Sequence, residues 1–131
     1  MKSPSPSRTG EHYESCFEFQ SSHYPAVRCR VIRPSFRRRL ELTQLLGDLV
    51  QTLEYHESGS TWSDQCKTAR LATELDILIV RWGLVSIDGL HIDGEPAVVD
   101  TLIERGPEAL TRELSERIRR ECGLTDDERK N

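Results

Sequence analysis

The stretch VSIDGLHI, residues 85–92, decides the fold class of this chain. It sets Asp88-Gly89 between two short arms in which apolar and polar residues alternate. Asp-Gly accepts the positive backbone angles of a tight β-turn, and alternation is typical of strands with one solvated face. The stretch therefore predicts a β-hairpin, and Asp93-Gly94 is expected to form the turn by which the chain leaves it.

Two long amphipathic helices are predicted before this hairpin, over residues 36–56 and 63–82. In both, apolar residues recur mainly at intervals of three and four. The predicted buried sides are Phe36, Leu40, Leu42, Leu45, Leu46, Leu49, Val50 and Leu53, then Cys66, Ala69, Ala72, Leu75, Ile77, Leu78 and Ile79. Ser35 has the residue type of an N-cap, and Gly83 is expected to end the second helix at C′. A short linker joins the helices, so they should pack as an antiparallel pair.

The two ends of the chain complete the fold prediction. Residues 15–32 alternate around a turn-like centre and predict an N-terminal β-hairpin. Toward the C-terminus, prolines and glycines bracket two short helices, with Pro96 and Gly106 around the first and Pro107 and Gly123 around the second.

Together these patterns predict one α+β domain over residues 15–124. Its elements are an N-terminal β-hairpin, two long helices as an antiparallel pair, a second β-hairpin and two short C-terminal helices. Residues 1–14 and 125–131 are polar and lack periodicity, so we expect them to be tails, the first of them disordered.

Composition narrows the classes of function. The chain has 131 residues, 36% of them hydrophobic and 31% charged, with a net charge of −4. This polar balance suggests disordered ends or a face that a partner covers, and the acidic total argues against a general polyanion binder. No apolar run approaches the ~18 residues that cross a bilayer, and no secretory signal opens the chain. We expect a cytoplasmic protein with four reduced cysteines and no membrane partner.

Catalytic and metal-binding patterns are weak. Asp88, His91 and Asp93 are possible metal ligands, but both aspartates are better explained as the first residues of Asp-Gly turns. No nucleophile motif and no phosphate-binding glycine loop is present. We therefore predict a protein that is not an enzyme and has no cofactor and no metal site.

An arginine cluster is the first candidate binding feature. It comprises Arg28, Arg30, Arg33, Arg37, Arg38 and Arg39. Guanidinium groups could bind an acidic protein or phosphates, or they could simply solvate a strand face and a helix start. Arginine at a helix N-terminus opposes the macrodipole, which favours a use for Arg37, Arg38 and Arg39 as partner-binding residues. No aromatic platform interleaves with the arginines, and the net charge is acidic, which disfavours nucleic acid.

The second candidate is a narrow apolar stripe in the last predicted helix. Leu110, Leu114 and Ile118 recur every four residues among arginines and glutamates. The charged residues are typical of an ordinary solvated helix face, whereas the stripe could dock on a partner helix. We name these three residues as candidates for apolar docking. Trp82, by contrast, is expected to close the core where the helix meets the hairpin.

The second half of the chain resembles bacteriophage tail assembly chaperones and related small prophage tail-region proteins. The resemblance lies in RWGLVSIDGLHIDGEPA (81–97), GPEALTRELSERIRREC (106–122) and the closing GLTDDERKN (123–131). Its matching residues are Trp82, Gly83, Val85, Gly89, Gly94, Pro96, Leu124, Glu128, Lys130 and Asn131. The resemblance implies a non-catalytic protein that binds the long, helical tape-measure protein before the tail tube polymerises.

Three functional hypotheses follow. The first is a tail assembly chaperone that binds the tape-measure protein. The second is a structural tail component or a tail-completion adaptor. The third is a small nucleic-acid-binding protein that uses the arginines from Arg28 to Arg39. The oligomeric state and the identity of the partner stay open at this stage.

Overall fold

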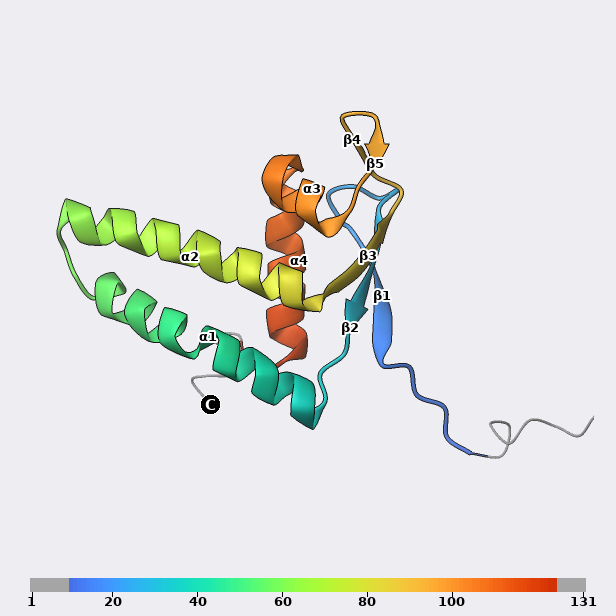
Figure 1. Cartoon of the computed structure of the whole chain (residues 1–131), viewed down its shortest axis with the longest axis horizontal. Coiled ribbons are helices and arrows are strands. Elements are labelled where there is room, and N and C mark those ends of the chain that lie inside the picture. Colours follow the sequence, from blue (N-terminus) through green and yellow to red (C-terminus); the bar gives the residue numbers. More distant parts are fainter. Residues whose placement is uncertain (1–9, 125–131) are drawn as a thin grey trace, which may run out of the picture.

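The computed structural model describes residues 10–124 and confirms the predicted α+β architecture (Figure 1). A three-stranded antiparallel sheet has the strand order β1-β2-β3, and a two-stranded ladder pairs β4 with β5. The strands are β1 (Cys16–Gln20), β2 (Arg28–Ile32), β3 (Leu84–Asp88), β4 (His91–Ile92) and β5 (Glu95–Pro96). The helices are α1 (Phe36–Glu57), α2 (Trp62–Gly83), α3 (Val99–Arg105) and α4 (Glu108–Glu121). The predicted tail at 125–131 and residues 1–9 lie outside the described residues, as do Glu128, Lys130 and Asn131 of the resemblance.

The predicted N-terminal hairpin forms as β1 and β2. Its alternation places Phe17, Phe19, Cys29 and Val31 on the buried face of the sheet. The opposite face is polar, and Glu18 stands directly across from Arg30. One face of the sheet therefore supplies the core, as period-two alternation predicts.

The second hairpin forms one turn later than the sequence predicts. The arm that begins at Val85 does not pair with the arm after Gly89; it belongs to β3, which pairs with β2. The local hairpin is instead β4 with β5, around Asp93-Gly94. Pairing with β2 extends a sheet and buries Leu84 at 6% exposure, which a short local ladder cannot do. Long-range pairing therefore overrode a favourable local turn.

Gly89 has a tertiary role in addition to its turn role. Its φ is +84°, a conformation that favours glycine. A Cβ at this position would lie 2.1 Å from the carbonyl oxygen of Ala26, in the connection between β1 and β2. The chain can leave β3 and cross that connection only because residue 89 has no side chain.

The predicted antiparallel pair of helices is confirmed as α1 and α2 (Figure 1). Ser35 caps α1 and accepts a hydrogen bond from the backbone N of Arg38 at 3.2 Å, as its residue type predicts. Thr61 caps α2, and the helix begins at Trp62, one residue before the predicted start. The cap is extended by Asp64, which accepts from the Thr61 hydroxyl at 2.8 Å and lies 3.0 Å from His56 Nδ1.

Gly83 ends α2 for a different reason from the one predicted. It is the last helical residue, and β3 begins directly at Leu84. A Cβ on Gly83 would lie 2.8 Å from Ile118 Cδ1, so glycine allows α2 and α4 to approach closely. Trp82 is partly buried against the core, which confirms its predicted packing role.

Helix α4 is a central element, and this overturns its predicted docking role. Leu110 and Leu114 are 0% exposed and Ile118 is 1% exposed, because α4 runs across α2 between the helical pair and the sheet (Figure 1). The stripe predicted to meet a partner helix therefore packs inside the chain's own core. The stripe is narrow because only one side of α4 is buried and the other sides face solvent.

Candidate functional site

An exposed face of α2 is the first part of the candidate site. Its residues are spaced by three or four positions, so they line one side of the helix; they are Trp62, Cys66, Ala69, Thr73 and Ile77. Trp62 is 78% exposed, the next three residues are exposed, and Ile77 is half-buried. We call this set the α2 stripe.

The sequence prediction was wrong about Cys66 and Ala69, which it placed on the buried side. Helix α1 packs instead on the opposite side of α2, where Leu71 and Leu75 are buried. The first half of α2 extends beyond α4, so only α1 flanks it there (Figure 1). Apolar periodicity could not distinguish the two sides, because both carry small or apolar residues.

The α2 stripe leads into a groove of about 270 Å³ between α2, α3 and α4. Ile77, Leu102 and Ile103 supply its apolar surface. Polar and charged groups complete the lining, namely Thr73, Asp76, Glu104, Glu108, Thr111 and Arg112, together with Gly106. The stripe and the groove share Thr73 and Ile77, so they form one continuous surface.

A polar network fixes the wall of this groove. Ser115, which is fully buried on α4, donates a hydrogen bond of 2.5 Å to Asp76 Oδ1 on α2. Arg119 donates to the same carboxylate oxygen and to the Ser115 hydroxyl, the latter at 3.2 Å. Hydrogen bonds from α4 to one carboxylate of α2 hold the two helices in one register. The groove is therefore bordered by elements that are already locked together.

The rim of the groove is mainly acidic. Glu104 and Glu108 are exposed on α3 and α4, and Arg112 lies 3.6 Å from Glu108. An apolar floor with a charged rim is the usual anatomy of a protein-binding surface. The arrangement suits an apolar side chain of a partner that enters the groove while basic groups of the same partner meet the rim.

The predicted partner-binding arginines separate into two kinds. Arg38 Nη1 donates to the carbonyl oxygens of Ser15 at 2.6 Å and Arg33 at 3.1 Å. Arg39 donates to the carbonyl oxygen of Cys122 at the end of α4. These two residues thus anchor the start of α1 to the sheet and to α4. Arg37 is exposed, and no partner for it occurs within residues 10–124.

The other arginines of the cluster also have partners in the chain. Arg28 lies 3.7 Å from Glu18, and Arg30 lies 3.8 Å from Glu14. Arg33 lies over the ring of Phe17 at 5.5 Å. Its guanidinium is also 6.0 Å from the centre of the Tyr13 ring. Folding therefore gives five of the six clustered arginines a contact within the chain.

The cysteines differ in burial, and the turn residue Asp93 has a partner on α3. All four cysteines are free thiols. Burial, with a smaller effect from the Glu113 carboxylate, raises the pKa of the Cys29 thiol to about 11. Asp93 has a φ of +52° in the β4–β5 turn, as predicted, and its carboxylate lies 3.1 Å from Arg105. Within residues 10–124, no three side chains of the metal-ligating types converge.

Comparison with known proteins adds no assignment to these observations. None of the helices between residues 10 and 124 is long and apolar enough to span a bilayer. No family model, curated protein or solved structure matches the chain.

Proposed function

We propose that this chain is a non-catalytic protein that binds an amphipathic helical segment of a partner protein along the α2 stripe and into the groove at its end. The observation that carries the proposal is the continuity of these two surfaces through Thr73 and Ile77. Trp62 is a large aromatic residue at the outer end of the stripe, where such residues supply much of the binding free energy of protein interfaces.

The dimensions favour a peptide segment over a small-molecule ligand. Sites for drug-sized ligands typically have volumes of about 300–1,000 Å³, and this groove is at or below the lower end. A helix that docks in a groove inserts anchoring side chains at intervals of three and four residues. The α2 stripe has the same spacing, so two helices could pack side by side along it.

The resemblance to tail assembly chaperones supplies a specific partner for this proposal, the tape-measure protein. A long helical protein that is not yet inside a tail tube exposes apolar stripes, and an apolar surface with a charged rim would cover them. A structural tail component could use the same surface. The two functions differ in that a chaperone is absent from the finished particle, whereas a component is present at fixed stoichiometry.

A nucleic-acid-binding function has less support. Five of the six clustered arginines already contact a carboxylate, a carbonyl oxygen or an aromatic ring of the chain. Binding to nucleic acid depends on cationic side chains that neutralise phosphates and so release the counterions condensed on them. Arg37 alone is a small site for that purpose.

The test is co-expression with the tape-measure protein, followed by affinity purification after nuclease treatment. Trp62→Ala and Ala69→Arg alter the α2 stripe at exposed positions and should leave the fold intact. We expect each to reduce recovery of the partner at least about tenfold, the effect of losing ~1.4 kcal/mol of binding free energy. The matched control is Tyr55→Ala, which removes an aromatic residue that is 73% exposed on α1 and lies off the stripe.

The outcomes separate the alternatives. If the partner never co-purifies, the tape-measure assignment fails. If it co-purifies equally well with the two stripe variants, the partner binds elsewhere and the α2 site is wrong. In a parallel purification without nuclease, recovery of nucleic acid that is lost with rising salt would instead favour the third hypothesis.

A further inference from the structure

The charged side chains that line the groove between α2, α3 and α4 differ in whether the chain itself pairs them. Asp76 accepts a hydrogen bond from Arg119, and Glu108 lies 3.6 Å from Arg112. Glu104 is exposed near the end of α3, and its carboxylate has no ion pair and no hydrogen bond in the described part of the chain. The groove therefore presents a carboxylate that the fold leaves unpaired.

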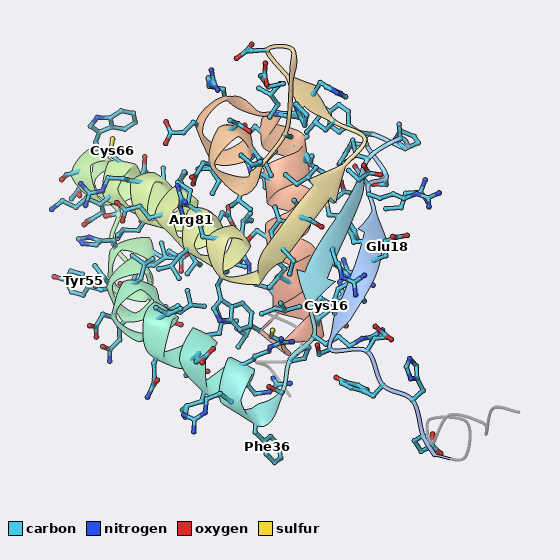
Figure 2. The ribbon with its side chains drawn as sticks, turned by 45° about the vertical axis from the view of Figure 1, so that its right-hand side comes forward. Cys16, Glu18, Phe36, Tyr55, Cys66 and Arg81 are labelled. Atoms are coloured by element: carbon cyan, nitrogen blue, oxygen red, sulfur yellow. The ribbon has the colours of Figure 1, made fainter. Side chains whose placement is uncertain are left out.

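The other two charged residues of α3 both have ion pairs. Asp100 lies 2.5 Å from Arg81, which is near the end of α2 that leads into the sheet (Figure 2). Arg105, the neighbour of Glu104 in sequence, lies 3.1 Å from Asp93 in the β4–β5 turn. Both basic residues are therefore occupied by an acid other than Glu104.

The cations of α2 and α4 that have no ion pair in the described residues lie away from the groove. Lys67 precedes Ile77 by ten positions, about 15 Å along the helix axis. Arg120 follows Arg112 by eight positions, about 12 Å. Arg70, by contrast, pairs at 3.8 Å with the glutamate one turn after it. The groove end of the surface is thus acidic, and Glu104 is its exposed charge.

The helix dipole of α3 does not account for Glu104. The last turn of a helix exposes carbonyl oxygens with partial negative charge, so an acidic side chain there is slightly unfavourable. Arg105, the last residue of α3, has the favourable sign. A cation supplied from outside the chain would remove the small cost of placing Glu104 in this turn.

An apolar contact lies directly beside this charge. Ile103 is half-buried and lines the groove with Ile77 and Leu102, and Glu104 is the next residue in sequence. Side chains three or four positions apart on a helix are neighbours, with Cβ atoms about 5–6 Å apart. One partner helix can therefore place an apolar side chain in the groove and a cationic side chain beside Glu104.

We infer that Glu104 selects the partner by forming an ion pair with a lysine or arginine that the partner helix carries one turn from its apolar anchor in the groove. The inference rests on the proposed function and adds the charge of the partner segment to it. The α2 stripe contains no lysine, arginine, aspartate or glutamate, so it cannot discriminate between partners by charge. A helix with an acidic residue beside Glu104 is repelled, which makes the selection specific.

The test is selection of helical peptides from a defined library by the full chain. Peptides of about 20 residues are long enough to span α2 from Trp62 to Ile77. Their leucines on one face are fixed, and each flanking position is lysine, glutamate or glutamine. We expect the wild type to enrich lysine at one position next to a fixed leucine.

Two synthetic peptides that differ only in lysine or glutamate at the enriched position measure the preference by fluorescence anisotropy. The lysine peptide should bind about three- to tenfold more tightly, the range for an exposed attractive pair in place of a repulsive one. The preference should decrease as salt rises, because Glu104 is exposed.

Variants of Glu104 assign the preference to this residue. Glu104→Lys should reverse it, so that the glutamate peptide binds more tightly. Glu104→Gln should bring the two affinities within about twofold of each other. Its melting temperature should be unchanged or slightly higher, because an unfavourable charge leaves the last turn of α3. The matched control is Glu41→Lys, which changes the net charge equally at an exposed position on α1 and should keep the lysine preference.

The results distinguish this inference from the function on which it rests. If the wild type enriches no helix, or if Ala69→Arg leaves enrichment unchanged, the proposed binding surface is wrong and the inference fails with it. If Ala69→Arg abolishes binding but the wild type does not prefer lysine, the helix-binding site stands and the role of Glu104 is wrong. A lysine preference that survives Glu104→Lys also overturns the role of Glu104.

Discussion

Ser22 and Glu113 join the β1–β2 connection to α4 through two hydrogen bonds to one oxygen. The backbone N of Ser22 donates to Glu113 Oε2 at 2.8 Å, and the Ser22 hydroxyl donates to the same atom at 2.6 Å. The hydroxyl of Ser21, which is 2% exposed, donates to Glu113 Oε1 at 2.7 Å. The Glu113 carboxylate thus connects α4 to the loop between β1 and β2.

The Glu113 contact predicts a pH-dependent contribution to stability. Burial by itself raises the pKa of the Glu113 carboxyl, but the hydrogen bonds from Ser22 and Ser21 outweigh burial and lower the pKa below its ordinary value. A lowered pKa in the folded state means that the stabilisation is present above the unfolded-state value of about 4.3 and is lost as pH falls through the folded-state value. Glu113→Gln should therefore lower the free energy of unfolding at pH 7 by about 1–3 kcal/mol.

Urea denaturation at pH 7 and near pH 3 measures this effect. The difference between wild type and Glu113→Gln should shrink at the lower pH, as the Glu113 carboxyl becomes protonated and loses its charge. Glu108→Gln, at an exposed position on the same helix, is the control and should change stability little at either pH. An equal loss at both values would show that the charge of Glu113 is not what stabilises the contact.

A comparison of Gly89 with Gly94 tests whether the backbone of Ala26 restricts residue 89 to glycine. Both have a positive φ, +84° and +85°, but only Gly89 faces a backbone atom, the carbonyl oxygen of Ala26. Gly94→Ala should cost about 1 kcal/mol for the left-handed conformation alone. Gly89→Ala should cost clearly more, because the sheet connection must also move. Thermal unfolding of the two variants compares them, and equal losses would contradict the close approach.

Substitution of Leu114 tests whether the apolar stripe of α4 belongs to the core or forms a docking surface. Leu114→Ala creates a cavity at a position with 0% exposure and should cost about 2–5 kcal/mol in the free energy of unfolding. Leu45→Ala, at a leucine that is 50% exposed on α1, should cost less than about 1 kcal/mol. Chemical denaturation of the isolated protein gives both values. A nearly neutral Leu114→Ala would restore the interpretation of this stripe as a partner-binding surface.

Arg38 and Arg37 are neighbours on α1, but of the two only the Arg38 side chain donates hydrogen bonds within residues 10–124. Arg38→Ala removes donors to the Ser15 and Arg33 carbonyl oxygens and should lower stability by about 1 kcal/mol. Arg37→Ala should leave stability within about 0.5 kcal/mol of wild type. Chemical denaturation of the two variants compares these effects. Equal effects would contradict the anchoring role of Arg38.

The thiols should react in the order of their exposure. Cys66 is exposed on the α2 stripe, whereas Cys29 is buried and has a thiol pKa of about 11. Only the thiolate is nucleophilic, so native alkylation at pH 8 should modify Cys66 well before Cys29. Mass spectrometry of partly alkylated protein gives the order. Protection of Cys66 by a bound partner would in addition map that partner to the stripe.

Several features were determined by the sequence itself, because they depend on interactions within about four residues. The cap at Ser35, the turn at Asp93-Gly94 and the periodicity of the two long helices are of this kind. Each follows from backbone preferences and side-chain spacing that neighbouring residues satisfy. The α+β class and the antiparallel helical pair could be predicted on the same basis.

The tertiary structure alone decided which apolar faces are buried and which are free. A strand that could have formed a local hairpin paired with β2 because that pairing buries more surface. The apolar stripe of α4 is buried by the helices and the sheet around it. Cys66 and Ala69 are exposed because α1 packs on the opposite side of α2. Apolar periodicity identifies a face that can be buried, but the burial itself depends on partners distant in sequence. For the same reason the candidate binding surface appeared only once the helices were packed.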